Sequence, residues 1–272
     1  MSVLKNKRGV SQYEYERAFN SMYQYFKIQL NKVPIRRKKW LNTPLTDILR
    51  DVHMTIMELT TGYTEPKNKQ QWRYNLITHA LHRLSDLQKP LYCHWAIMQT
   101  DERHRKTWCE SINTEIALLH GMQKANPCYK PDDETEVNFI MYYKTSDIEA
   151  ARFLSNMRDL LRYSHTKIIH ASKEFDGFES DTIIELVDDA WYHCIAANQK
   201  IPETENEYRK RRSHISKAIS CLHKLNRPML SLFILVGYSE DTMREWSDLL
   251  VEEIRLLTAL QKSDRKRFGS LR

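Results

Sequence analysis

One sequence occurs twice in the chain, and this repeat constrains the fold more than any other feature. The segment 84–90 (LSDLQKP) returns as 222–228 (LHKLNRP), 138 positions later. A period of that length is too long for a solenoid repeat and has the size of a small domain. The same offset joins further identical residues: Asp51 and Asp189, Ile77 and Ile215, Ala80 and Ala218, Trp108 and Trp246, and Glu115 and Glu253. We therefore expect one module that is present in two copies.

The repeated module has the composition and the periodicity of helices. Only 6 Gly and 8 Pro occur among the 272 residues, which leaves little material for hairpin turns. Apolar residues recur every three or four positions in four stretches per copy, and four amphipathic helices bury their apolar faces best as a bundle. The fold class that we predict is all-α, with two tandem antiparallel four-helix bundles. The predicted domains are a first bundle at 1–124, a linker at 125–145 and a second bundle at 146–272.

Several local signals predict where the helices begin, end and bend. Thr43 and Pro44 predict the start of a second helix, and Asp101 and Ser239 are predicted helix N-caps at equivalent positions. Ser11 with Glu14 has the pattern of a capping box at the start of the first helix. Pro90 and Pro228 each fall inside a long helical stretch and predict the same kink in both copies.

The composition also indicates a compartment. The five cysteines form no C-x-x-C pair and are odd in number, so they indicate buried thiols in a reducing environment. The N-terminal residues have no apolar signal core, and no apolar run reaches the length of a membrane span. We expect a cytoplasmic protein that has no membrane partner.

Patterns that carry catalytic chemistry are scarce. A di-iron bundle needs Glu-x-x-His on two helices, and no Glu here is followed three positions later by His. The sequence also lacks a glycine-rich phosphate loop, so we expect no cofactor, no metal and no enzymatic activity. One alternative stays open, because helical ribonucleases of the HEPN type use an Arg followed by His after four to six residues. Arg73 with His79 and Arg158 with His165 fit that spacing, as chance matches also would.

The charge distribution indicates a polyanionic partner. Lys and Arg number 42 against 35 Asp and Glu, and residues 1–137 carry +6 of the net charge of +7. Basic residues neutralise phosphates, and neighbouring aromatic rings such as Trp40, Trp108 and Tyr208 can stack on unpaired bases. For Trp108 and Trp246, which lie on inward stripes, we predict core positions. The candidate nucleic-acid-binding residues form five clusters: Lys5, Lys7 and Arg8; Arg36, Arg37, Lys38 and Lys39; Arg103, Arg105 and Lys106; Arg209, Lys210, Arg211 and Arg212; and Lys262, Arg265, Lys266 and Arg267.

Four segments of the chain resemble a known family. The opening 1–8, the helices 45–61 and 84–95 and the ending 262–267 are similar to the accessory variability determinant proteins of diversity-generating retroelements. They also resemble the wider bacterial four-helix-bundle family that includes the ribosomal intervening-sequence proteins. The resemblance implies a non-catalytic protein that binds a reverse transcriptase and the retroelement's template RNA through basic surfaces. Family members are single bundles that assemble into a pentameric barrel, whereas this chain has two bundles.

These observations lead to three hypotheses. The first is an RNA- and reverse-transcriptase-binding accessory protein that supports mutagenic cDNA synthesis primed on template RNA, as part of a ribonucleoprotein. A homo-oligomeric ring is one assembly that this hypothesis allows, and the charge distribution places RNA on the first bundle. The second hypothesis is a HEPN-type ribonuclease. The third is a structural adaptor that binds only proteins and has no salt-dependent affinity for RNA.

Overall fold

The computed structural model describes residues 3–61, 69–130, 139–171 and 177–271, and it places side chains from Glu14 onward with the exception of Thr61. All regular structure in these residues is helical, which confirms the predicted all-α class. The chain divides into two compact units. Unit 1 comprises Met1–Leu91 and Asp101–Tyr142, and unit 2 comprises Tyr92–Thr100 and Tyr143–Arg272.

Unit 1 is built around four long helices. They are α1 (Val3–Asn31), α2 (Lys38–Thr61), α3 (Lys69–Asp86) and α5 (Glu102–Lys124), and a short 3-10 helix, η1 (Ile35–Arg37), precedes α2. Helix α1 contacts α2 and α5, and α3 contacts the same two helices. The core contains large aromatic side chains, with the Phe26 and Trp108 ring centroids 4.5 Å apart. This contact brings the C-terminal part of α1 to the N-terminal part of α5.

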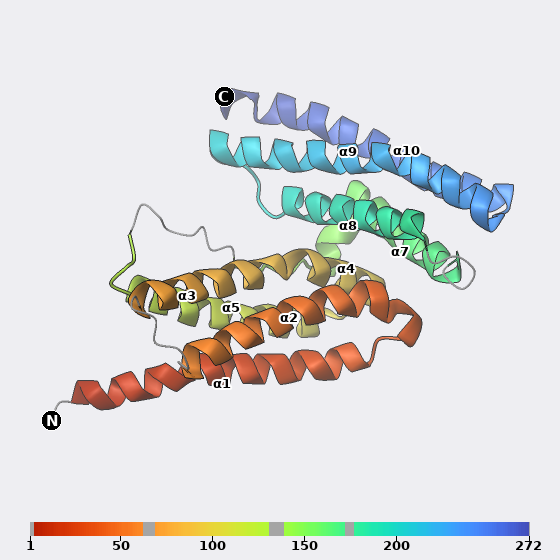
Figure 1. The fold of residues 1–272 in the computed structure, drawn as a ribbon. Helices are drawn as coiled ribbons and strands as arrows, with labels where there is room; N and C mark the ends of the chain where they lie inside the picture. Colours follow the sequence, from red (N-terminus) through yellow and green to blue (C-terminus); the bar gives the residue numbers. More distant parts are fainter. Residues whose placement is uncertain (1–2, 62–68, 131–138, 172–176, 272) are drawn as a thin grey trace. The chain divides into compact units, whose positions relative to one another are not determined.

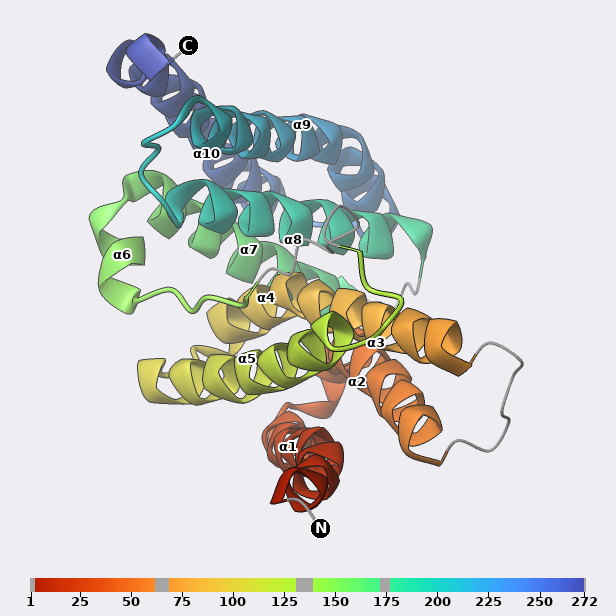
Figure 2. The same ribbon diagram turned by 90° about the vertical axis from the view of Figure 1, so that its left-hand side faces the viewer.

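The four long helices of unit 2 contact one another in the same order as those of unit 1. It contains the short helix α6 (Thr145–Ala150), then α7 (Arg152–Ala171), α8 (Phe178–Asn198), α9 (Glu205–Val236), α10 (Glu240–Arg267) and the 3-10 helix η3 (Gly269–Leu271). Helix α8 lies beside α7 and α9 (Figure 2), and α10 contacts α7 and α9 as well. Helices α9 and α10 run side by side in opposite directions (Figure 1).

Residues 138 positions apart make equivalent contacts in the two units. The buried Trp108 meets Tyr25 edge-on at 6.3 Å, and the buried Trp246 meets Tyr163 at 6.1 Å. The amide of Gln123 donates to Thr78 Oγ1 at 2.8 Å, and that of Gln261 donates to Ser216 Oγ at 3.0 Å. Both tryptophans therefore lie in the core, as predicted.

The helix ends repeat too. Asp101 accepts a hydrogen bond from the His104 backbone N–H, and Ser239 accepts one from Thr242, so both predicted N-caps are confirmed. Gln99 and Gly237, again 138 positions apart, have φ angles of 53° and 69°. A left-handed residue after the last turn is a common way to end a helix.

Two predicted helix starts are wrong. Helix α1 already begins at Val3, so Ser11 lies inside it and does not cap it. Helix α2 begins at Lys38, directly after η1, and Pro44 lies within it. The hydroxyl of Thr46 donates to the Asn42 carbonyl at 2.9 Å, so a side chain accompanies the backbone through this proline-containing turn.

The two long proline-containing stretches differ in the structure. In the first copy the stretch is interrupted at Leu87, where α3 ends and α4 (Gln88–Met98) begins. In the second copy α9 passes through Pro228 as one helix. Helix α4 also changes unit along its length, because Tyr92–Thr100 belongs to unit 2.

No helix within the described residues combines the length and the apolar character needed to cross a bilayer. The five cysteines are free thiols, of which Cys93, Cys109 and Cys194 are buried.

Candidate nucleic-acid interface

The structure brings together two basic clusters that lie about fifty residues apart in the sequence. The first turns of α9 lie against the last turns of α10, where Arg211 of α9 forms an ion pair with Asp264 of α10. Arg211 Nε lies 2.5 Å from Asp264 Oδ2, and both side chains are almost completely buried. One turn further out, the rings of Tyr208 and Phe268 are 6.0 Å apart. The capping box of Thr204 and Glu207 begins α9 at this point.

The resulting surface, here called the basic end of unit 2, presents seven exposed cationic side chains. Arg209 forms an ion pair with Glu205 at 2.7 Å, and the guanidinium of Arg267 lies 5.2 Å from the Phe268 ring centroid. Four of the seven make no ion pair with any described residue: Arg212, Lys262, Arg265 and Lys266. The complete set is Arg209, Lys210, Arg212, Lys262, Arg265, Lys266 and Arg267.

Helix electrostatics accounts for only three of these seven cations. Cations in the last turn of a helix are stabilised by its dipole, so Arg265, Lys266 and Arg267 have a structural explanation. The opposite holds at a helix N-terminus, where Glu205 and Glu207 are the favourable residues of α9. Lys210 and Arg212 lie in the second turn of α9, beyond the first turn over which the dipole acts. Helix electrostatics therefore does not account for these two exposed cations.

Arg211 and Arg105 were predicted to contact nucleic acid, and their burial argues against it. Arg211 is held inside the interface of α9 and α10, where it also donates to the Ala197 carbonyl. Arg105 lies three residues before Trp108 on the inward face of α5 and is buried. A run of charges in the sequence does not by itself show which face of a helix each residue occupies, and this face decides whether the side chain is buried.

The other basic residues predicted to bind nucleic acid in unit 1 differ from one another in exposure. Arg36 and Lys39 are exposed, Arg37 and Lys38 are half-buried, and Lys39 Nζ lies 5.2 Å from the Trp40 ring centroid. Arg103 and Lys106 are exposed on the first turns of α5, where Lys106 pairs with Glu110 at 3.8 Å. The side chains of Lys5, Lys7 and Arg8 lie outside the described residues.

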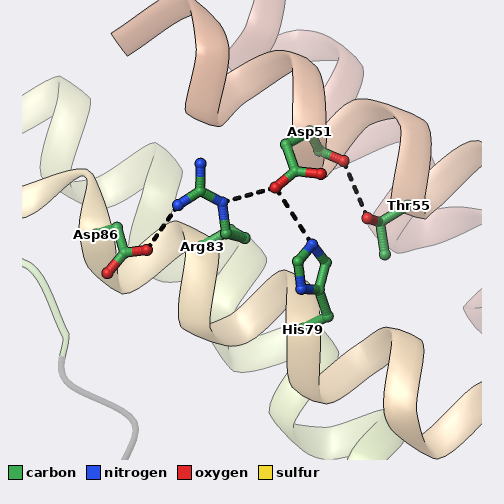
Figure 3. A network of polar contacts seen from close by, with 5 residues as sticks. All are labelled: Asp51, Thr55, His79, Arg83 and Asp86. Carbon is green, nitrogen blue, oxygen red and sulfur yellow. Dashed lines mark hydrogen bonds and ion pairs between the residues drawn. The ribbon is translucent and has the colours of Figure 1, made fainter. Parts of the chain in front are cut away.

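The histidines of the ribonuclease pattern each have an aspartate partner. Figure 3 shows His79 on α3, with its Nε2 atom 3.2 Å from Asp51 Oδ2 on α2. Arg83 Nε lies 2.6 Å from the same oxygen and its Nη1 lies 2.9 Å from Asp86 Oδ2. Partial burial raises the pKa of Asp51, but the bonds to His79 and Arg83 outweigh this effect and the pKa is lowered. The sequence does not reveal this partly exposed network, because Asp51 is 28 to 35 residues away from the other three residues in the chain.

The second histidine of the pattern is inaccessible. His165 is buried in unit 2 with its Nε2 atom 2.8 Å from Asp188 Oδ1. A buried imidazole that is already bonded to a carboxylate cannot reach the backbone of an RNA strand. Within the described parts of the chain, no group of three or more His, Cys, Asp or Glu side chains could hold a metal ion.

The chain matches no protein-family model, no curated protein and no solved structure.

Proposed function

We propose that the protein is a non-catalytic, cytoplasmic RNA-binding protein that contacts RNA through the basic end of unit 2. We further propose that it is the accessory protein of a reverse transcriptase in a diversity-generating retroelement. In this proposal each unit is an antiparallel four-helix bundle, and the two bundles derive from one duplicated module.

One observation carries the RNA-binding proposal. The clusters 209–212 and 262–267 are separate in the sequence and adjacent in the structure, where they supply seven exposed cations. The charge distribution of the sequence favoured unit 1 as the RNA-binding half. Among the described side chains of the predicted clusters, unit 1 exposes four cations, Arg36, Lys39, Arg103 and Lys106, whereas unit 2 exposes seven, so the proposal places RNA on unit 2. The retroelement context rests on the resemblance of the four segments named above.

The test is RNA binding by the purified chain across a series of salt concentrations. Each lost phosphate contact lowers the slope of log K against log salt by about 0.7 on single strands. The double variant Arg212→Ala/Lys266→Ala should therefore lower the slope by about 1.4 and weaken binding at low salt.

The chain offers a matched control. Lys224 and Arg227 are exposed on the second half of α9 and have no ion-pair partner among the described residues. The variant Lys224→Ala/Arg227→Ala removes the same two charges and should leave the slope close to that of the wild type. Equal slopes for both double variants would contradict the basic end as the binding surface.

A second series with a candidate reverse transcriptase tests the accessory role. Tighter RNA binding in the presence of the enzyme, with the RNA left intact, would support that role. The absence of any RNA affinity in both series would favour the adaptor that binds only proteins.

The ribonuclease alternative has one supporting observation, the exposed contact between His79 and Asp51. An aspartate can orient a histidine for general base catalysis, and Arg83 could contact a phosphate. Shortened RNA after incubation with the wild type, and intact RNA with His79→Ala, would establish this activity. The variant His165→Ala is unsuitable as a test, since that residue is buried and its loss would disturb the core.

A further inference from the structure

The last residues of α9, 230–236, form a segment called the α9 end. Its large apolar side chains are exposed: Leu230 at 55%, Ile234 at 70% and Leu235 at 48%. Residues 138 positions earlier form the segment 92–98, which belongs to unit 2 and whose members Tyr92 to Ile97 are all buried. The same part of the module is thus covered in one copy and uncovered in the other.

The structure shows what covers the buried copy. On α8, Trp191 Nε1 donates to the Tyr92 carbonyl at 3.0 Å, and the Tyr192 ring stacks on the Tyr92 ring at 6.3 Å. On α7, Arg162 Nε donates to the Ala96 carbonyl at 2.8 Å. A helix end of this module therefore fits onto the outer faces of the first two long helices of a module.

Unit 1 has an equivalent face on α1 and α2. Tyr192 corresponds to Met54, which is 59% exposed, and Arg162 corresponds to Gln24, an exposed amide that can also donate to a carbonyl. Ile28, one turn after Gln24, is also 59% exposed. These three residues, Gln24, Ile28 and Met54, define what is called the α1/α2 face. The chain thus carries an uncovered apolar helix end and an uncovered face of the kind that receives it.

We propose that the α9 end docks on the α1/α2 face of a second copy of this chain. Leu230 then takes the place of Tyr92 and packs on Met54, and Gln24 donates to the Ile234 carbonyl. The two surfaces are different, so the contact is head-to-tail, and it generates a closed ring or an open filament. The contact is apolar and does not depend on nucleic-acid binding.

The experiment is sedimentation velocity of the full chain over a concentration series, at high salt and without nucleic acid. The wild type should associate. A donor variant, Leu230→Glu/Ile234→Glu, and a receiver variant, Ile28→Glu/Met54→Glu, each bury unpaired carboxylates in the contact. Each variant should associate at least roughly 100-fold more weakly than the wild type. All four positions are exposed, and unchanged circular dichroism melting curves would verify that both variants fold.

Mixing the two variants makes the test specific. The donor variant keeps an intact α1/α2 face and the receiver variant keeps an intact α9 end, so an equimolar mixture should form a one-to-one dimer. A contact between two identical surfaces would not be restored by mixing the variants. A mixture that stays monomeric would therefore overturn the proposal. A monomeric wild type, or variants that associate as the wild type does, would also overturn it.

A matched control distinguishes this contact from general apolar adhesion. Phe178 and Ile201 are exposed at 82% and 68% in unit 2, outside both surfaces. The variant Phe178→Glu/Ile201→Glu should associate as the wild type does. Loss of association in this control would contradict the proposed location.

Discussion

The segments 92–98 and 230–236 lie 138 positions apart in the sequence, and they differ in burial. Both begin two residues after a proline, both are rich in apolar residues and both are followed by a residue with a left-handed backbone, Gln99 or Gly237. The first is buried within unit 2, whereas the second leaves Leu230 and Ile234 exposed at the end of α9. Residues that lie 138 positions apart in this chain therefore do not always have the same surroundings. The second copy retains surface that the first copy has covered.

The largest expected effect compares two aliphatic side chains at equivalent positions. Ile97 is buried and Leu235 is half exposed. The variant Ile97→Ala should lower the free energy of unfolding by about 2–5 kcal/mol, because it removes buried methyl groups and leaves a cavity. The variant Leu235→Ala should cost less than about 1 kcal/mol. Urea titration of both variants measures the difference, and similar losses would mean that the α9 end is covered in solution.

The next effect concerns the equivalent buried glutamates, Glu115 and Glu253. Burial raises the pKa of each carboxyl to about 8. Between the ordinary pKa of 4.5 and the raised pKa of about 8, the folded chain keeps a proton on each carboxyl that the unfolded chain has released. The stability of the fold therefore falls as the pH rises from about 5 to 8. In the variant Glu115→Gln, the free energy of unfolding should decrease between pH 5 and pH 8 by on the order of 3 kcal/mol less than in the wild type. Urea titrations at both pH values measure it, and an unchanged pH dependence would contradict the prediction.

A further prediction introduces a hydrogen-bond donor beside Glu115, like the one that Glu253 already has. Asn156 donates to Glu253 Oε2 at 2.9 Å, whereas neither carboxylate oxygen of Glu115 has a hydrogen-bond partner among the described residues. The position equivalent to Asn156 is Ala18. Because a donor stabilises the charged form, Ala18→Asn should lower the pKa of Glu115 and recover about 1–2 kcal/mol at pH 8. A gain that is equal at pH 5 would point to packing instead of the charged form.

The last comparison concerns the two prolines. Pro90 is the third residue of α4, where its missing N–H would have no helical partner in any case. Pro228 lies inside α9 and leaves the Lys224 carbonyl without its helical donor. The variant Pro228→Ala should raise the free energy of unfolding by about 1–3 kcal/mol, and Pro90→Ala should change it by less than about 0.5 kcal/mol. Thermal or urea unfolding measures both, and equal gains would show that the position within a helix does not matter here.

Much of the local structure was predictable because it depends on neighbouring residues. The caps at Asp101 and Ser239 need only a side-chain oxygen placed before an amphipathic stretch, and both form as predicted. The inward stripes correctly placed Trp108 and Trp246 in the core. The starts of α1 and α2 were mispredicted, since a capping pattern and a proline are also tolerated within a helix when its faces pack well.

The candidate site was only partly predictable, for a different reason. The clusters 209–212 and 262–267 were recognised as basic, but their adjacency depends on the antiparallel packing of α9 against α10. The same packing buries Arg211, which the sequence alone counts with its exposed neighbours. Charge is a property of a residue, whereas availability for binding is a property of the helix face and of what lies against it.

By itself the sequence determined that the chain is helical, that identical residues recur at an interval of 138 positions and where several helices begin and end. These properties follow from side-chain periodicity and capping, which act over a few residues. Only the tertiary structure decided that 92–98 is covered while 230–236 is exposed, and that α3 stops at Asp86 while α9 continues through Pro228. The reason is physical: Leu225, Met229 and Leu232 pack into one core on both sides of Pro228, whereas the residues after Leu91 leave unit 1 and belong to unit 2.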